Sequence, residues 1–366
     1  MLMKYLYLIS HPAHFHMFKY SMKELERRGH EIIAVIRPKD VLEQLCIDYG
    51  LNFIKIKSRP NKFGLLGLGV ALIDKDFQLL KIVNEHKPDL LLGSDGTLAR
   101  VGSWKGIPSF EFNEDDAEAI KLYAITSFPF YSNIVCPEVT SAWLWNKKKI
   151  GFNSYHELAY LHPNQFTPDK IVVKKYFNPE EPYFIIRFAK LTAHHDTGIT
   201  GITTAIASKI IGMLKPHGTI YITSERELEP EFEQYRIQIN PLDMHHVMAF
   251  ADIYIGDSQT MAAEAGVLGV PFVRFNDFVG RLSYLNELEN KYQLGYGHKT
   301  NDPEGMYASL KKLINITNRK EIFATRRKVM LEEKIDYAKF QTWFIENYPQ
   351  SAKVMKENPG YQERFR

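Results

Sequence analysis

Residues 251–275 read ADIYIGDSQTMAAEAGVLGVPFVRF, and this stretch decides the fold. Apolar residues at 253–255 indicate a strand, residues 259–268 have a helical pattern, and residues 271–275 indicate a second strand. A strand, a helix and a strand in this order form parallel strands joined by a right-handed crossover. The stretch is therefore one unit of a doubly wound α/β fold, in which ligands bind beyond the carboxyl ends of the strands.

The same alternation continues on both sides of this stretch. Further strands are expected at 5–9, 31–36, 52–56, 89–92, 109–112, 134–136, 183–188, 219–223 and 235–239. Helices are expected at 15–28, 41–49, 70–86, 203–214, 244–250 and in pieces over 304–348. The alternation stops at about 147–182, a stretch with four prolines and no clear period. We therefore expect two Rossmann-like halves with a linker in that stretch.

Length and composition restrict the class of protein. The 366 residues suit two domains, and 13% aromatic residues with a net charge of +3 exclude a mainly disordered chain. This charge is also too small to indicate a nucleic-acid partner. No apolar run approaches the about 20 residues that a membrane span needs. Two cysteines provide neither a disulfide framework nor metal-ligand spacing, so we expect a cytoplasmic protein.

The loop after the first strand reads HPAHFH at 11–16. An imidazole can take a proton from a hydroxyl near neutral pH or donate a hydrogen bond to a phosphate. We expect His14 to be catalytic and His11 to bind substrate. The alternative is that these histidines cap the following helix or pack against it. No cysteine or carboxylate accompanies them, so we expect no metal site.

Two more loops of the first half follow expected strands. Residues 93–97 read GSDGT, and Asp95 is expected to be catalytic or, alternatively, to cap the helix that starts near residue 98. Residues 113–116 read NEDD. Here Glu114 is expected to bind substrate, and a solvated turn is the alternative.

A charged loop opens the second half. It reads RFAKLTAHHD at 187–196. Arginine, lysine and two histidines after a strand suit an anionic ligand, and a charged surface loop is the alternative. We expect His194 to be catalytic, and Arg187 and His195 to bind substrate.

The turn at 255–265, IGDSQTMAAEA, indicates a nucleotide site. A helix that begins with small hydroxyl residues offers N–H groups and the positive end of its dipole to a phosphate. A plain helix cap is the alternative, but it does not explain Glu264 among alanines; that carboxylate could accept from two ribose hydroxyls. The substrate-binding residues expected here are Gly256, Asp257, Ser258, Thr260, Met261 and Glu264.

Four motifs together carry a resemblance to a known family: HPAHFH at 11–16, YHELAYLHPNQF at 155–166, RFAKLTAHHD at 187–196 and IGDSQTMAAEA at 255–265. On these motifs, most of the chain resembles a family of unknown function that is related in fold to UDP-N-acetylglucosamine 2-epimerases. The strand, the hydroxyl-rich helix start and the following glutamate are also similar to the nucleotide-sugar site of GT-B enzymes.

The resemblance implies a GT-B-like α/β fold, with two Rossmann-like domains facing across a cleft. The implied domains are an acceptor-side domain at 1–165 and a nucleotide-sugar domain at 166–335. The helical segment 336–366 is expected to return to the first domain.

The pattern of true epimerases is matched only in part. Asp95 and the run Thr192-Ala193-His194 fall where those enzymes carry an aspartate and a Thr-x-His loop start. Their glutamate directly after strand five is replaced by Asn113, with Glu114 one residue late. Their Ser-Gly-Gly phosphate start reads Ser258-Gln259-Thr260 here. These departures put epimerisation in doubt.

The resemblance and the motifs together favour a glycosyltransferase that uses a UDP-type nucleotide sugar in polysaccharide biosynthesis. Ser258 and Thr260 would hold the diphosphate, Arg187 and His194 would offset the leaving-group charge, and His14 or Asp95 would deprotonate the acceptor. The nucleotide sugar is a substrate, so no cofactor is expected. A nucleotide-sugar epimerase or hydrolase and a non-catalytic nucleotide-sugar-binding protein are the alternatives.

The acceptor is expected to be a glycan or a lipid-linked molecule. The apolar run at 63–72, flanked by basic residues, and the cluster of Trp143, Trp145 and 147–149 could contact the inner face of a membrane. A buried loop and helix start is the alternative.

Overall fold

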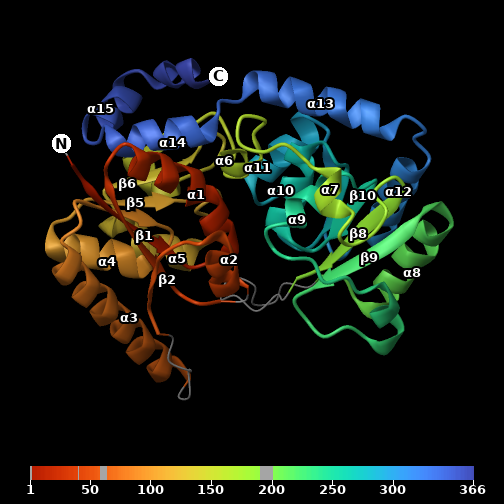
Figure 1. Ribbon diagram of the computed structural model, residues 1–366, viewed down its shortest axis with the longest axis horizontal. Coiled ribbons are helices and arrows are strands. Elements are labelled where there is room, and N and C mark those ends of the chain that lie inside the picture. The colour runs from red at the N-terminus through yellow and green to blue at the C-terminus, as the bar shows by residue number, and fades with distance from the viewer. Residues whose placement is uncertain (1, 40, 58–63, 190–200) are drawn as a thin grey trace. The chain divides into compact units, whose positions relative to one another are not determined.

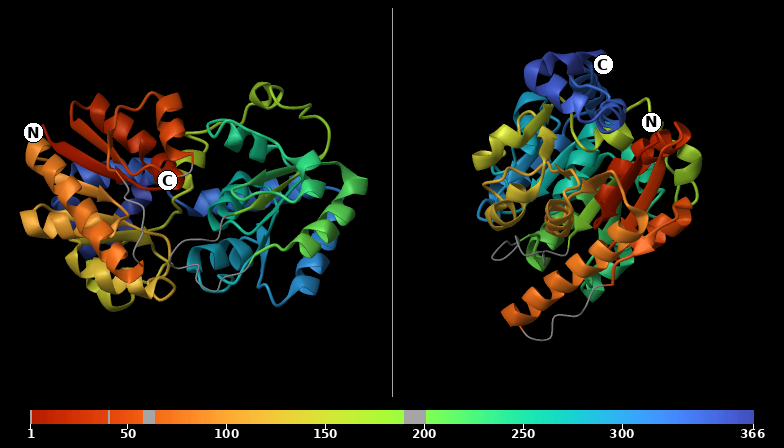
Figure 2. Two further views of the ribbon diagram at one scale, coloured as in Figure 1. Left: turned by 90° about the horizontal axis from the view of Figure 1, so that it is seen from below. Right: turned by 90° about the vertical axis from the view of Figure 1, so that its left-hand side faces the viewer.

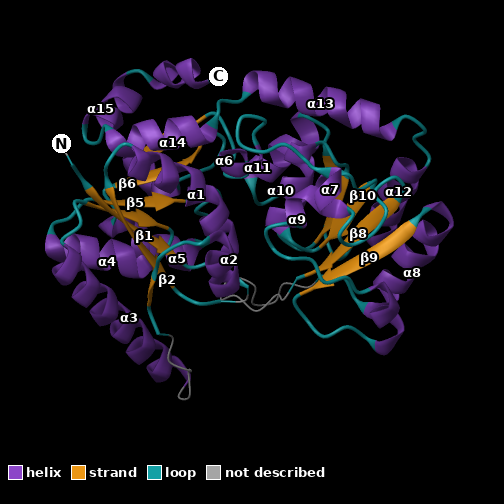
Figure 3. Cartoon of the chain, in the orientation of Figure 1, coloured by secondary structure: helices purple, strands orange, loops and turns teal. Residues whose placement is uncertain are grey.

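The computed structural model describes residues 2–39, 41–57, 64–189 and 201–366; for residues 64–70 it describes the helix but not the side chains. The chain divides into two compact units. Unit 1 comprises Met1–Tyr160 and Ile335–Arg366, and unit 2 comprises Leu161–Lys334. In each unit a parallel sheet is flanked by helices (Figures 1 and 3). The expectation of an α/β fold with two Rossmann-like sheets is confirmed.

The sheet of unit 1 has the strand order β3-β2-β1-β4-β5-β6-β7. Its strands are β1 (Lys4–Ile9), β2 (Glu31–Ile36), β3 (Ile54–Lys55), β4 (Leu90–Gly93), β5 (Ser109–Phe112), β6 (Asn133–Pro137) and β7 (Lys149–Phe152). Its helices are α1 (Pro12–Arg27), α2 (Leu42–Tyr49), α3 (Gly64–His86), α4 (Gly96–Lys105), α5 (Lys121–Ser127), α6 (Leu158–Leu161, at the boundary), α14 (Tyr337–Glu346) and α15 (Gln350–Glu357). Since every pair is parallel, the loops after these strands share one edge of the sheet.

Both faces of this sheet are covered, which explains why its strands are apolar without alternation. On one face, Leu6 and Leu91 belong to a core cluster with Leu79 of α3 and Leu98 of α4. On the other face, the ring of Phe110 in β5 lies 5.4 Å from that of Phe344 in α14.

The sheet of unit 2 has the strand order β12-β11-β10-β8-β9. Its strands are β8 (Tyr183–Phe188), β9 (Thr219–Ser224), β10 (Ile253–Gly256), β11 (Phe272–Phe275) and β12 (Gly295–His298). Its helices are α7 (Lys170–Val173), α8 (Thr204–Leu214), α9 (Met244–Ala249), α10 (Gln259–Leu268), α11 (Ser283–Asn286), α12 (Pro303–Ile314) and α13 (Arg319–Glu333). Helices α9 and α10 lie together on one face, and α8 and α12 on the other (Figure 1).

The last two helices belong to unit 1. Helix α14 packs along α1, and the C-terminal segment lies beside the N-terminal elements in both views of Figure 2. The tail is also hydrogen-bonded to the unit, since Gln362 accepts from the backbone N–H of Asn153 at 2.6 Å and donates to Glu138 at 2.7 Å.

Two local expectations were wrong, and one strand was not expected. Residues 149–152 form the edge strand β7, although they lie in the stretch assigned to the linker. Residues 235–239 form no strand: a short 3₁₀ helix ends at Tyr235, and a single bridge joins Arg236 to Ile222. Strand β12, GYGH, was not expected, because two glycines and a histidine give it no strand-like composition.

Among the described residues, no helix combines the length and the hydropathy that crossing a bilayer requires.

Candidate functional site

The loop after β1 holds two of the candidate histidines. His11 is the N-cap of α1, and its Nδ1 accepts from the backbone N–H of Ala13 at 3.2 Å. His14 lies in the first turn, with its Nδ1 3.4 Å from Ser10 Oγ. Burial, and then electrostatic interactions with His11, His156, Arg37 and Lys39, hold the pKa of His14 well below its usual value. The His14 imidazole is therefore neutral at neutral pH, the form that can accept a proton.

Asp95 follows β4 and has two structural contacts. One carboxylate oxygen accepts from the backbone N–H of Thr97 at 3.0 Å, which makes Asp95 the N-cap of α4. The other oxygen accepts from Arg37 at 2.8 Å. The capping alternative is therefore present in the structure, and Arg37 adds a counter-charge.

Glu111 is a buried carboxyl group that sequence reasoning missed. It lies inside β5, and it accepts from Ser94 Oγ at 2.7 Å and from Tyr123 Oη at 2.9 Å. Burial raises the pKa of Glu111 to about 8. The charge of Asp95 contributes a smaller rise to the pKa of Glu111. The signal was the strand SFEF, which places a charged residue in the middle of a sheet that is covered on both faces.

Glu114 and His156 meet at the same edge. Glu114 follows β5 and His156 follows β7, and Glu114 Oε2 lies 3.4 Å from His156 Nδ1. The His156 ring lies nearly parallel to the rings of Phe152 and Tyr337, with centroids 5.9 and 5.6 Å away, and those two rings stack on each other at 4.1 Å. Burial lowers the pKa of His156 to about 3, so its imidazole is neutral. Sequence reasoning quoted His156 only as part of a family motif and gave it no role.

Unit 2 presents its candidates at the carboxyl end of β10. Gly256 is the last residue of this strand, and a Cβ there would lie 2.5 Å from Tyr254 Oη. Ser258 is the N-cap of α10 and accepts from the backbone N–H of Met261 at 3.4 Å. Thr260 and Met261 are half-buried in the first turn of this helix.

Asp257 is tied to the chain at two points. Its carboxylate oxygens accept from the backbone N–H groups of Ala189 at 2.6 Å and Ile202 at 3.3 Å. Burial raises the pKa of Asp257 to about 6. This side chain therefore joins the start of α10 to the residues on either side of 190–200.

Glu264 has a specific buried neighbour. It faces α9, and its Oε1 lies 2.9 Å from His245 Nε2. Both side chains are buried.

Arg187, at the end of β8, is paired with Glu225 of the loop after β9. The Tyr183 hydroxyl donates to the backbone oxygen of Val247, so the side chain of Tyr183 points to the face of the sheet that carries α9. Arg187 and Tyr254 lie on the same face by the register of β8 and β10. Glu264 of α10 is also close enough to act electrostatically on Tyr254.

Several expected residues cannot be placed. Thr192, His194 and His195 lie outside the described residues, as does the start of the apolar run at 63–72.

The tryptophan cluster of unit 1 is packed against the protein. Trp143 and Trp145 are partly buried and contact the core of unit 1. Lys148 donates to the backbone oxygens of Phe128, Pro129 and Tyr131. Among the described residues, no cluster of three histidine, cysteine or acidic side chains is placed to hold a metal ion.

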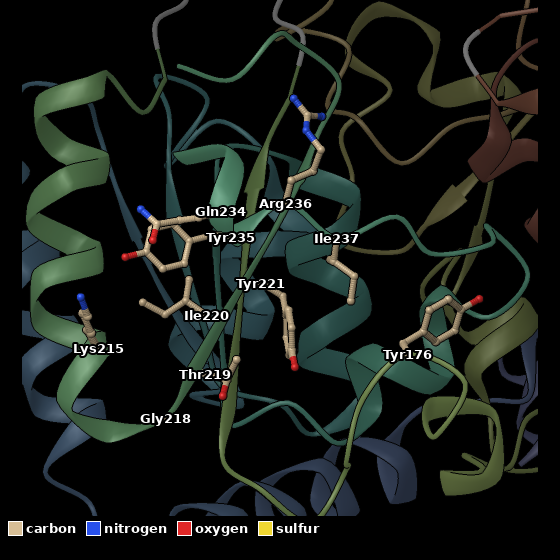
Figure 4. A pocket seen from close by; sticks show the side chains of 10 residues that line it. All are labelled: Tyr176, Lys215, Gly218, Thr219, Ile220, Tyr221, Gln234, Tyr235, Arg236 and Ile237. Atoms are coloured by element: carbon tan, nitrogen blue, oxygen red, sulfur yellow. The ribbon is translucent and has the colours of Figure 1, made fainter. Parts of the chain in front are cut away.

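Two of the cavities formed by the described residues lie in unit 2, and neither is lined by a candidate residue. One, of about 510 Å³, lies beside the edge strand β9 and is lined by residues such as Tyr221, Tyr176 and Arg236 (Figure 4). The other, of about 620 Å³, is lined by residues from the ends of α9 and α10 and from α13.

Comparisons with known proteins agree with this architecture. Residues 4–338 match the model of the family described as "Protein of unknown function (DUF354)". No curated protein matches the sequence.

Solved structures of similar fold include glycosyltransferases and an epimerase. Spinosyn forosaminyltransferase SpnP has a TM-score of 0.62 at 12% identity, covering 94% of this chain and 98% of that one. UDP-GlcNAc 2-epimerase from Neisseria meningitidis, bound to UDP-GlcNAc, has a TM-score of 0.58 at 16% identity, covering 90% and 99%. MurG from Acinetobacter baumannii has a TM-score of 0.56 at 12% identity, covering 94% and 99%. At such identities the likeness shows the fold, which is that of GT-B glycosyltransferases and UDP-GlcNAc epimerases.

Proposed function

The chain belongs to the family described as "Protein of unknown function (DUF354)", and we propose that it is a metal-independent glycosyltransferase of the GT-B type. Its donor is a UDP-type nucleotide sugar, and its acceptor is a glycan or a lipid-linked molecule. The reaction takes place in the cytoplasm, at the inner face of the membrane, in the synthesis of cell-surface polysaccharide.

The observation that carries the proposal is the buried pair formed by Glu264 of α10 and His245 of α9. Ser258 caps α10, and Glu264 lies on its buried face with His245 Nε2 at 2.9 Å. A carboxylate held by an imidazole is a fixed acceptor for ribose hydroxyls. The N–H groups and dipole of the helix start, with Thr260, suit a diphosphate. The nucleotide-sugar complex of the Neisseria epimerase lends further support.

The proposed chemistry is a transfer between two oxygens. The bond from the anomeric carbon to the diphosphate oxygen breaks, and the acceptor oxygen forms a bond to that carbon. The neutral imidazole of His14 takes the acceptor proton, and Asp95 is the alternative base. Arg187, His194 and the start of α10 stabilise the negative charge left on the nucleoside diphosphate. His11, Glu114 and His195 contact the substrates.

A nucleotide-sugar epimerase or hydrolase is the second candidate. The observation that favours it is the buried Glu111, whose pKa of about 8 lies close to the working pH of a general acid or base. Together with Asp95 and Glu114, it supplies carboxyl groups for proton transfer at the same sheet edge.

A panel of UDP-sugars, offered with and without candidate acceptors, separates these functions. Release of UDP that depends on the acceptor supports a transferase. Release of UDP or a changed sugar without any acceptor supports the second candidate. Tight binding without any turnover indicates a nucleotide-sugar-binding protein, and it would contradict both enzymatic proposals.

A further inference from the structure

A fully buried arginine lies behind the first turn of α10. Arg274 of β11 is 0% exposed. Two of its guanidinium nitrogens donate to Glu289 Oε1 at 3.0 and 2.8 Å, and the third donates to Gln259 Oε1 at 2.8 Å. Glu289 therefore balances the charge, while Gln259, the first residue of α10, receives a charge-assisted hydrogen bond.

A second donor reaches the same oxygen. The side-chain amide of Asn276 donates to Gln259 Oε1 at 3.2 Å and to the backbone oxygen of Asp257 at 3.0 Å. Since a guanidinium has no acceptor, the atom of Gln259 that faces Arg274 must be the oxygen. This fixes the orientation of the amide group, which cannot flip without placing donors against donors.

The NH₂ group of Gln259 must then lie on the other side of its amide carbon. It has no hydrogen-bond partner among the residues that the structure describes, and it is not one of the buried unpaired atoms. Gln259 is half-buried at the helix start, so its two N–H donors are presented beside the first backbone amides of α10.

An independent observation indicates that this strand end is built for a ligand. Tyr254 is 0% exposed, and its hydroxyl has no partner within the described parts of the chain. That hydroxyl reaches Gly256, the residue two positions before the cap of α10. Arg187 Nε, on the neighbouring strand, is likewise buried and unpaired. Buried polar groups without partners are costly, and a polar ligand at Gly256 would satisfy them.

We propose that the side-chain amide of Gln259 is a phosphate donor, oriented by Arg274 and Asn276, and that it recognises the diphosphate of the nucleotide. This inference rests on the proposed function, because it refines the phosphate end of the same site. At this position a glycine would offer only backbone, whereas Gln259 adds two N–H donors with a set direction.

The test measures Kd by calorimetry for uridine, UMP, UDP and inorganic pyrophosphate. Gln259→Glu keeps the oxygen that accepts from Arg274 and Asn276, but it replaces both donors with a negative charge. We expect Gln259→Glu to weaken binding of UDP and pyrophosphate about 10- to 100-fold, and Gln259→Ala to weaken it less. Binding of uridine should not change. Gln234→Glu, an exposed site in the same unit, is the control for net charge.

The outcomes distinguish this inference from the proposed function. If the wild-type protein binds UDP and both Gln259 variants bind it equally well, the donor role is overturned and the proposed function is unaffected. If the wild type binds pyrophosphate through Gln259 but binds no nucleotide, the proposed function is overturned and the donor role stands. Melting temperatures of all variants are compared, and an equal loss of uridine and UDP binding would mean that Gln259 is merely structural.

Discussion

Replacing Glu264 by glutamine tests the ribose contact with little disturbance of the fold. In the structure Glu264 Oε1 lies 2.9 Å from His245 Nε2, and both side chains are buried. A glutamine has the same length, and its remaining oxygen can keep this hydrogen bond. The second carboxylate oxygen becomes an NH₂ group, so a ribose hydroxyl that donates to Glu264 loses a charged acceptor.

The magnitude follows from the change in hydrogen-bond type. Hydrogen bonds to charged groups contribute about 1.5–3 kcal/mol and neutral ones about 0.5–1.5 kcal/mol. The difference of about 1–1.5 kcal/mol corresponds to roughly 5- to 10-fold weaker UDP binding. Glu264→Ala removes both oxygens, so we expect about 10- to 100-fold weaker binding. It also leaves the buried His245 without this partner, which should lower the free energy of unfolding by about 1–3 kcal/mol.

The assay is calorimetric titration with UDP and with its 2′-deoxy and 3′-deoxy analogues. The wild-type protein should prefer UDP to both analogues, and this preference should shrink in Glu264→Gln and vanish in Glu264→Ala. Glu304→Gln, an exposed carboxylate of the same unit, serves as the control. An undiminished preference for UDP in both Glu264 variants would refute the assignment of this carboxylate to the ribose.

Three further predictions concern unit 1. His14→Gln and Asp95→Asn should each lower turnover about 10²- to 10⁴-fold while UDP binding persists; normal turnover at an unchanged melting temperature would show that the acid–base groups lie elsewhere. The pKa of Glu111 rises from 4.5 to about 8 on folding, so its contribution to stability is complete below pH 4.5 and is lost as the pH rises through 8. Denaturant titrations at several pH values should show that Glu111→Gln removes this decline, and an unchanged pH profile would contradict it. The pKa of His156 falls from 6.5 to about 3, so its contribution is present above pH 6.5 and is lost as the pH falls through 3. His156→Gln should make unfolding less sensitive to acid, and equal acid sensitivity in both proteins would count against a buried neutral imidazole.

The fold was predictable because its signal is local and repeated. Buried parallel strands such as β1, β4 and β10 are continuous apolar runs, and the helices between them have clear ends, for example Gly269 after α10. Strands β7 (KIGF) and β12 (GYGH) escaped prediction because lysine, glycine and histidine interrupt their apolar residues. Their pairing comes from the sheet beside them, which a sequence window does not contain.

The sequence selected candidate residues by their place after a strand or in the helix that follows it. This rule selected His14, Asp95 and Glu264, but it could not show that Asp95 pairs with Arg37 or that Glu264 faces His245. These partners are 58 and 19 residues away in sequence.

Glu111 was missed for a related reason. It lies inside a strand and not after one, and its partners Ser94 and Tyr123 come from other elements. Gln259 looked like a departure from a glycine pattern, and only the position of Arg274 behind it gives the side chain a direction.

The chain path makes unit 1 a discontinuous domain into which unit 2 is inserted as one continuous piece. During synthesis, residues 1–160 leave the ribosome long before α14 is made. The contact between Phe110 of β5 and Phe344 of α14 therefore cannot form until synthesis is nearly complete. The inserted piece, Leu161–Lys334, has its whole sheet and its own core in one stretch and needs no later residue to complete them. Co-translational folding should therefore be completed in unit 2 before it is completed in unit 1. A stop codon before residue 335 would remove α14 and α15, and so would leave unit 1 incomplete although most of it is synthesised first.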